Sequence, residues 1–152
     1  HVGLELARIL SRHDLELFLI DSRLEQLTDE RLAPLQDGLA RIYAHHVSVP
    51  ESILPTLPSG THVLIMTQDH AEDIALCDFA LRQWGLASIG LIGSSAKWAR
   101  FRKALKAEGH SDAELERITT PIGIPGLTAK EPAAIAVSVA MSLLMEFEKH
   151  TA

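Results

Sequence analysis

The segment Ile89-Gly-Leu-Ile-Gly-Ser-Ser-Ala-Lys97 places a glycine, two hydroxyl groups and a lysine directly after a short apolar run. Such a run, followed by a glycine turn, is typical of a buried parallel strand that leads into a helix. The free backbone N–H groups and the dipole at the start of a helix stabilise negative charge. Gly93, Ser94, Ser95 and Lys97 are therefore predicted to hold an anionic group, such as the phosphate of a nucleotide or a pterin.

The tetrapeptide Thr67-Gln-Asp-His70 gathers a hydroxyl, an amide, a carboxylate and an imidazole after another apolar run. Ligands of doubly wound sheets bind at the carboxyl ends of the strands, so Thr67, Asp69 and His70 are expected to line the same edge as the glycine turn. Asp69 is equally well placed to cap the next helix, and both interpretations stay open. His70 could hydrogen-bond a ligand or transfer a proton.

A third candidate lies at the start of the chain. His1-Val2-Gly3 fits the last three positions of the dinucleotide-binding pattern G-x-G-x-x-G, and Asp21 follows Gly3 by 18 residues. A carboxylate at about this distance binds a ribose hydroxyl in such folds. The alternative is that Asp21 is an ordinary residue at the end of a strand.

The elements that would position these residues alternate between helix and strand. The apolar spacing predicts helices at 4–12, 24–40 (broken at Pro34), 69–84, 96–108, from 111 and from 128, with Pro132 in the first turn of the last one. It predicts strands at 15–21, 46–49, 62–66 and 86–92. This alternation indicates an α/β fold with a doubly wound, mostly parallel, Rossmann-like sheet in a single domain over residues 1–152.

An alternating fold of this kind begins with a strand, whereas this chain begins with a helix. We therefore expect the first strand to lie upstream of His1, and the chain to be a fragment of a longer one. Without that strand the sheet would have a gap between its halves, with backbone groups left unpaired.

Composition narrows the class of protein. The net charge of −6 argues against a nucleic-acid binder and suits a cytoplasmic protein, and we expect no membrane span. A single cysteine, Cys77, excludes a disulfide framework and is interpreted as a buried structural thiol. We expect no metal site, because His45 and His46 come from a different strand from His70. The last helix is apolar nearly all round, which favours burial on two sides, one against its own sheet and the other against a second subunit or a missing domain; we expect a homodimer.

These segments, in this order, resemble the C-terminal Rossmann-like domain of the xanthine dehydrogenase accessory proteins, the XdhC/CoxI family. The resemblance covers essentially the whole chain. The matching motifs are His1-Val2-Gly3, Asp21, Thr67 to His70, Gly90 to Lys97, Pro121-Ile-Gly123, Lys130-Glu-Pro132 and Ile135-Ala-Val-Ser138.

The resemblance implies a molybdenum cofactor chaperone. Such a protein binds the cofactor (molybdopterin), assists its sulfuration together with a cysteine desulfurase, and assists its insertion into a xanthine dehydrogenase-type enzyme. Two features depart from the family. Gln68 stands where the family usually has histidine. The family's separate N-terminal domain, with its functional cysteine, is not among these 152 residues, and Cys77 is no evident substitute for that cysteine.

Two other functions remain as alternatives. An NAD(P)-binding oxidoreductase or nucleotide-binding regulatory domain is supported by Gly3 and Asp21, although the only tyrosine, Tyr43, cannot form a Tyr-x-x-x-Lys pair. A pure interaction module would use the apolar last helix. No nucleophile, base and orienting group stand together, so we name no catalytic residue and favour an accessory role over an enzyme.

Overall fold

The computed structural model describes residues 2–151, so His1 of the expected glycine pattern lies outside the described residues. The chain divides into two compact units. The first unit comprises His1–Pro50 and Gly123–Lys149, and the second comprises Glu51–Ile122 with the last three residues.

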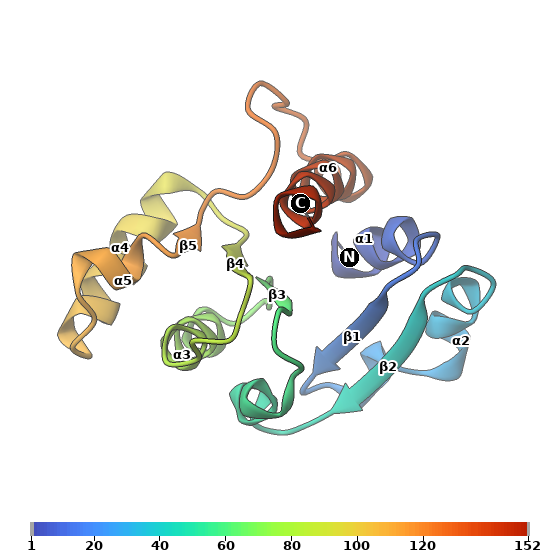
Figure 1. Ribbon diagram of the computed structural model, residues 1–152, viewed down its shortest axis with the longest axis horizontal. Helices are drawn as coiled ribbons and strands as arrows, with labels where there is room; N and C mark the ends of the chain where they lie inside the picture. Colours follow the sequence, from blue (N-terminus) through green and yellow to red (C-terminus); the bar gives the residue numbers. More distant parts are fainter. Residues whose placement is uncertain (1, 152) are drawn as a thin grey trace. The chain divides into compact units, whose positions relative to one another are not determined.

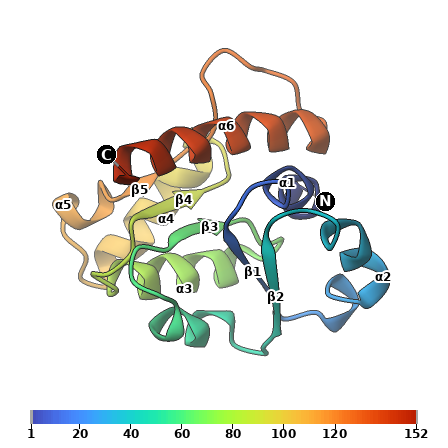
Figure 2. The ribbon, with the colours of Figure 1, turned by 45° about the vertical axis from the view of Figure 1, so that its right-hand side comes forward.

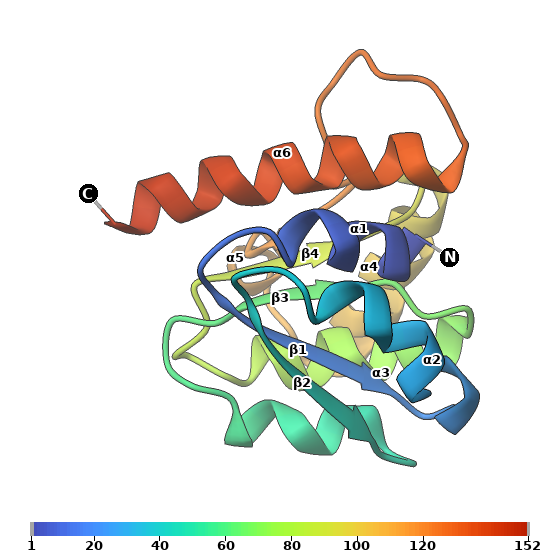
Figure 3. The same ribbon diagram turned by 90° about the vertical axis from the view of Figure 1, so that its right-hand side faces the viewer.

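The first unit contains a two-stranded parallel sheet. Its elements are α1 (Val2–Leu10), β1 (Glu16–Asp21), η1 (Leu24–Gln26), α2 (Asp29–Leu32), η2 (Ala33–Leu35), β2 (Arg41–His46) and most of α6 (Pro132–Thr151). β1 and β2 pair in register from Glu16↔Arg41 to Asp21↔His46 (Figure 3). Buried Ala7, Leu32 and Leu35 form a small core against one face of this sheet.

One predicted strand of the first unit is placed wrongly. A strand was expected at 46–49, whereas β2 ends at His46. β2 is largely exposed and carries Arg41, His45 and His46, so it lacks the apolar run that identifies a buried strand. Cross-strand stacking holds it instead, with the ring centroids of Phe18 and Tyr43 5.1 Å apart.

The second unit is built on a three-stranded parallel sheet in the order β3-β4-β5 (Figure 1). Its elements are η3 (Pro50–Thr56), β3 (His62–Ile65), α3 (His70–Leu81), β4 (Ser88–Leu91), α4 (Ser95–Ala107), α5 (Asp112–Leu115) and β5 (Ile118–Thr119). Its core joins the three strands to α3 and α4 and is centred on Ile65, Leu81, Leu91, Phe101 and Leu105. β5 was not predicted, because two residues are too short for any periodicity.

The α/β, Rossmann-like class is confirmed. Strands and helices alternate, and every strand pair is parallel. The five strands fall into two sheets, so residues 2–151 form no contiguous sheet. The expected strand upstream of His1 concerns residues beyond this chain and stays a prediction.

The last helix, α6, runs continuously from Pro132 (Figure 2). The first hydrogen bond of this helix runs from the N–H of Ile135 to the carbonyl of Glu131, at 3.0 Å. The helix therefore begins at Pro132 and not at Thr128 as expected. Val137, Met141 and Met145 lie at intervals of four residues and are all exposed. The prediction that a homodimer covers one side of this helix stays a prediction. No helix in the described part of the chain is long and apolar enough to cross a membrane.

We expect Gly90→Ala to destabilise the protein by about 1–3 kcal/mol. A Cβ at Gly90 would lie 2.6 Å from Cδ1 of Ile122 and 3.0 Å from Cδ1 of Leu64, so both side chains would have to repack. Urea unfolding measures the loss. Gly85→Ala is the matched control, because its nearest new contact, Oγ of Ser59, is an ordinary 3.5 Å. Equal midpoints for the two variants would contradict the prediction.

Candidate functional site

Two loops of the second unit follow neighbouring strands and lead into neighbouring helices. One loop joins β3 to α3, and the other joins β4 to α4. Because β3 and β4 are parallel and in register, Ile65 opposite Leu91, both loops leave the sheet at the same edge. We call Thr67–His70 and Gly93–Lys97 the carboxyl edge. Seven of the predicted site residues lie on it: Thr67, Asp69, His70, Gly93, Ser94, Ser95 and Lys97.

The first loop is organised as a helix cap. Oδ1 of Asp69 accepts hydrogen bonds from the N–H groups of Ala71 (2.8 Å) and Glu72 (3.4 Å), which confirms the capping interpretation. Oγ1 of Thr67 accepts a bond from the N–H of Asp69 (3.2 Å) and donates one to its carbonyl (2.9 Å). Thr67 and Asp69 therefore fix the backbone at the start of α3.

Four backbone donors of the second loop have no partner in the described part of the chain. Oγ of Ser94 caps α4 by accepting the N–H of Lys97 at 3.1 Å. The N–H groups of Gly93, Ser94, Ser95 and Ala96 make no hydrogen bond to the described part of the chain. A helix start with unpaired N–H groups is suited to binding an anion, and the anion site at this loop stays a prediction.

The side chain of Lys97 connects the two loops. Its Nζ donates to Oδ2 of Asp73 at 3.0 Å and to the carbonyl of Ile92 at 2.9 Å, and it lies 5.1 Å from the ring centroid of Phe101. The other oxygen of Asp73, Oδ1, accepts the N–H of Thr67 at 2.9 Å. The Asp73 side chain is fully buried and that of Lys97 is 13% exposed. This pair ties the end of β3 to the end of β4.

The ion pair changes the expected role of Lys97. Its charge is matched by Asp73, so the anion would be held by the N–H groups at the start of α4 rather than by a free ammonium. Gly93 permits this arrangement, since a Cβ there would lie 2.5 Å from Cδ of Lys97. Sequence reasoning missed Asp73. Its one signal is a carboxylate one helical turn after Asp69, among apolar neighbours.

Two further side chains complete the surroundings of the pair. His70 is exposed and meets the ring of Phe101 edge-on, with centroids 5.8 Å apart, so it stays accessible to a ligand. Cys77 is fully buried. Burial, together with the negative charge of Asp73, raises the pKa of its thiol to about 12. The predicted structural thiol is confirmed.

Gly3 and Asp21 belong to the first unit. Gly3 lies in the first turn of α1, and Asp21 is the last residue of β1. The Asp21 carboxylate accepts three hydrogen bonds from Arg23: from its N–H at 2.9 Å, from Nε at 3.1 Å and from Nη2 at 3.2 Å. Any ribose hydroxyl would therefore share this carboxylate with a guanidinium.

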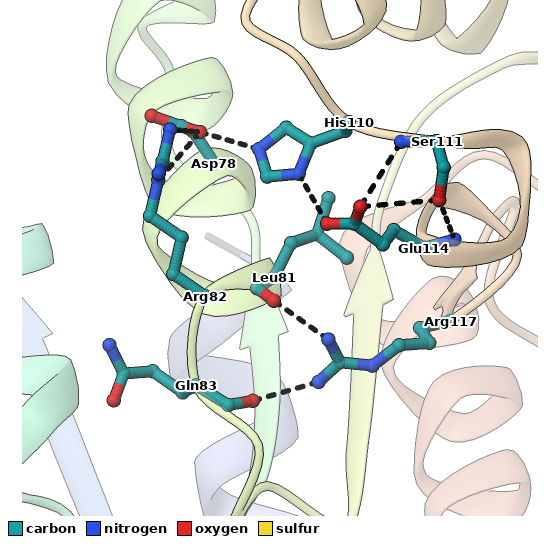
Figure 4. A network of polar contacts seen from close by, with 8 residues as sticks. All are labelled: Asp78, Leu81, Arg82, Gln83, His110, Ser111, Glu114 and Arg117. Carbon is teal, nitrogen blue, oxygen red and sulfur yellow. Dashed lines mark hydrogen bonds and ion pairs between the residues drawn. The ribbon is translucent and has the colours of Figure 1, made fainter.

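A second polar network, which the sequence did not indicate, lies at the other end of α3 (Figure 4). The His110 ring is 5% exposed, and its Nε2 lies 2.6 Å from Oδ1 of Asp78 while its Nδ1 lies 2.9 Å from Oε2 of Glu114. Glu114 also closes a capping box with Ser111 at the start of α5. Both ring nitrogens face carboxylates. An ionised carboxylate can only accept a hydrogen bond, so both ring nitrogens must carry a proton.

The pKa of His110 follows from two opposing effects. Burial alone lowers it, but hydrogen bonds to Glu114 and Asp78 and their charges raise it, and the net pKa lies above the ordinary 6.5. The same contact with His110 lowers the pKa of Glu114.

Nearby, Arg117 donates to the carbonyls of Leu81 (2.7 Å) and Gln83 (2.8 Å) at the end of α3. In the described part of the chain no group of three or more His, Cys, Asp or Glu residues is placed to hold a metal ion.

Comparison with known proteins decides the family. A family model described as the XdhC Rossmann domain matches residues 1–143. The chain belongs to this family. No curated protein matches it at a significant level. As an XdhC Rossmann domain, it is part of a group named for xanthine dehydrogenase accessory proteins, and the family implies association with xanthine dehydrogenase-type enzymes.

We expect Lys97→Met to lower the free energy of unfolding by roughly 3–5 kcal/mol, because it leaves the charge of Asp73 buried without a partner. Chemical denaturation measures the change. Lys103→Met, on the exposed side of the same helix, is the control and should be close to neutral. Adding Asp73→Leu to Lys97→Met should recover part of the loss. A Lys97→Met variant no less stable than Lys103→Met would refute this account.

The His110 network predicts a stability that depends on pH. Since the folded pKa is raised, the contribution of His110 is complete below the unfolded value of about 6.5 and is lost as pH rises through the folded pKa. His110→Gln should therefore cost about 1–3 kcal/mol at pH ~6, and less as pH increases. Urea titrations over this range test it, with His13→Gln at an exposed position as control. A stability difference that does not vary with pH would contradict the charged ring.

Proposed function

We propose that the carboxyl edge of the second unit holds the molybdenum cofactor, and that the chain accompanies it to a xanthine dehydrogenase-type enzyme as a chaperone. The observation that carries this proposal is the row of N–H groups from Gly93 to Ala96, at the start of α4, that have no partner among residues 2–151. A phosphorylated pterin needs such donors for its phosphate and polar groups for its ring edges. His70 would supply such a group from the neighbouring loop, where the hydroxyl of Thr67 is already bonded to the backbone of Asp69.

The edge is better suited to holding a ligand than to changing it. The oxygens of Asp69 and Ser94 cap helices, and the ammonium of Lys97 is paired with Asp73. His70 is the one titratable side chain of the carboxyl edge that neither caps a helix nor forms an ion pair in the described part of the chain. These interactions support an accessory role, because the described residues of the carboxyl edge include no nucleophile with an adjacent base.

Two partners belong to the same proposal. Sulfuration of the cofactor would take its sulfur from a cysteine desulfurase, because the only thiol here, Cys77, is buried and protonated. A homodimer would use the exposed line of Val137, Met141 and Met145 on α6.

NAD(P) is the competing ligand. Asp21 stands at the end of β1, where a ribose-binding carboxylate is expected, but its oxygens already accept bonds from Arg23. The two ligands would use different residues, so parallel titrations with each ligand distinguish the two functions.

The test is calorimetric titration with isolated molybdenum cofactor and, in parallel, with NADPH. We expect sub-micromolar binding of the cofactor and a roughly tenfold weaker affinity for Ser95→Pro. Ser95 is the first residue of α4, where proline is well tolerated, so this change removes one N–H donor while the helix is kept.

Ser95→Ala is the matched control, since it removes only the hydroxyl and should bind nearly as well as the unaltered chain. Tight binding of NADPH with none of the cofactor would overturn the proposal. Equal affinities of the proline and alanine variants would exclude the start of α4 as the anion site.

A further inference from the structure

A hydroxyl group of the second unit has no hydrogen-bond partner. Oγ1 of Thr120 is buried and unpaired in the described part of the chain. A buried hydroxyl without a partner is disfavoured, and native structures contain few of them. Such a group is explained when a ligand or a bound water supplies the missing bond.

The position of Thr120 relates this hydroxyl to the carboxyl edge. β5 pairs with β4 in parallel, Gly90 opposite Thr119, so Thr120 is the next step along the strand, beside Leu91. The ladder stops there, because Pro121 has no N–H to continue it. Thr120 thus stands at the end of β5, as Gly93 follows β4 and Thr67 follows β3.

A free donor follows the neighbouring strand. The N–H of Ile92, just after β4, donates to the carbonyl of Ile65 at 3.1 Å. The chain then bends at Gly93, whose N–H makes no hydrogen bond to the described residues. Gly93 and Thr120 therefore follow the ends of two paired strands, β4 and β5, one with an amide and one with a hydroxyl that lack a partner in the described part of the chain.

We propose that Thr120 is a further ligand-binding residue, whose hydroxyl donates a hydrogen bond to a phosphate oxygen of the ligand held at the carboxyl edge. This inference rests on the proposed function and adds the end of β5 to the site. Oγ1 is buried in the conformation described while the residue as a whole is part-buried, so binding requires rotation about χ1 to another staggered position.

The experiment compares Thr120→Val, which removes the hydroxyl and keeps the shape, with Thr120→Ser, which keeps the hydroxyl. Thr119→Val is the control, because Thr119 is adjacent and exposed. Each variant is titrated with molybdenum cofactor and with inorganic phosphate, and its urea midpoint is measured without ligand.

We expect Thr120→Val to bind the cofactor roughly tenfold more weakly, while its ligand-free midpoint equals or exceeds that of the unaltered chain, since an unpaired hydroxyl is lost. Thr120→Ser and Thr119→Val should bind as the unaltered chain does. A lower midpoint with unchanged affinity would make the hydroxyl a structural group, satisfied by water, and would overturn the inference.

The two probes separate this inference from the proposed function. If the cofactor does not bind, but phosphate stabilises the unaltered chain more than Thr120→Val, the proposed function fails and the inference stands. If the cofactor binds both proteins equally, the inference fails alone. If neither probe distinguishes the two proteins, it is overturned as well. Should Thr120→Val not fold, methyl NMR of the unaltered chain decides: the Thr120 methyl signal must shift with ligand while that of Thr119 does not.

Discussion

The buried pair of Lys97 and Asp73 is the constraint on which the carboxyl edge depends. A fully buried carboxylate is tolerated only with a matching charge and with hydrogen bonds to its remaining oxygens. Asp73 obtains the first from Nζ of Lys97 and the second from the N–H of Thr67. Lys97 in turn donates to the carbonyl of Ile92. The requirement of one carboxylate thereby fixes where both strand-end loops begin.

The same rule accounts for the network at the other end of α3. His110 is buried against Asp78 and Glu114, and its second ring proton is needed because both neighbours only accept. α3 is thus joined to the end of β4 by Lys97 and to α5 by His110, one charge at each end. The two ties differ in chemistry. An imidazolium can lose its proton near neutral pH, so the tie to α5 depends on the raised pKa of His110.

The sequence predicted the features that depend on neighbouring residues. Asp69 caps α3, and the helices predicted from 96 and from 111 begin at Ser95 and Asp112, because each of these signals spans only a few positions. What it could not predict depends on residues far apart in the chain. Lys97 and Asp73 are separated by 24 positions and His110 and Asp78 by 32, so nothing local marks them as partners. The strands β2 and β5 were misplaced or missed because an exposed strand and a two-residue strand carry no apolar pattern.

The pairing of Lys97 with Asp73 affects how tightly the carboxyl edge would hold its ligand. A free lysine would attract a phosphate with a full charge over several ångströms, whatever the orientation of the ligand. With that charge matched by Asp73, retention would depend on directional hydrogen bonds from the start of α4, which weaken steeply as the geometry departs from ideal. Such a site favours a ligand of the right shape, and its affinity falls when a partner moves the ligand slightly out of position. On the proposed function, a carrier that must surrender its cofactor to an enzyme benefits from this kind of binding more than from a stronger electrostatic one.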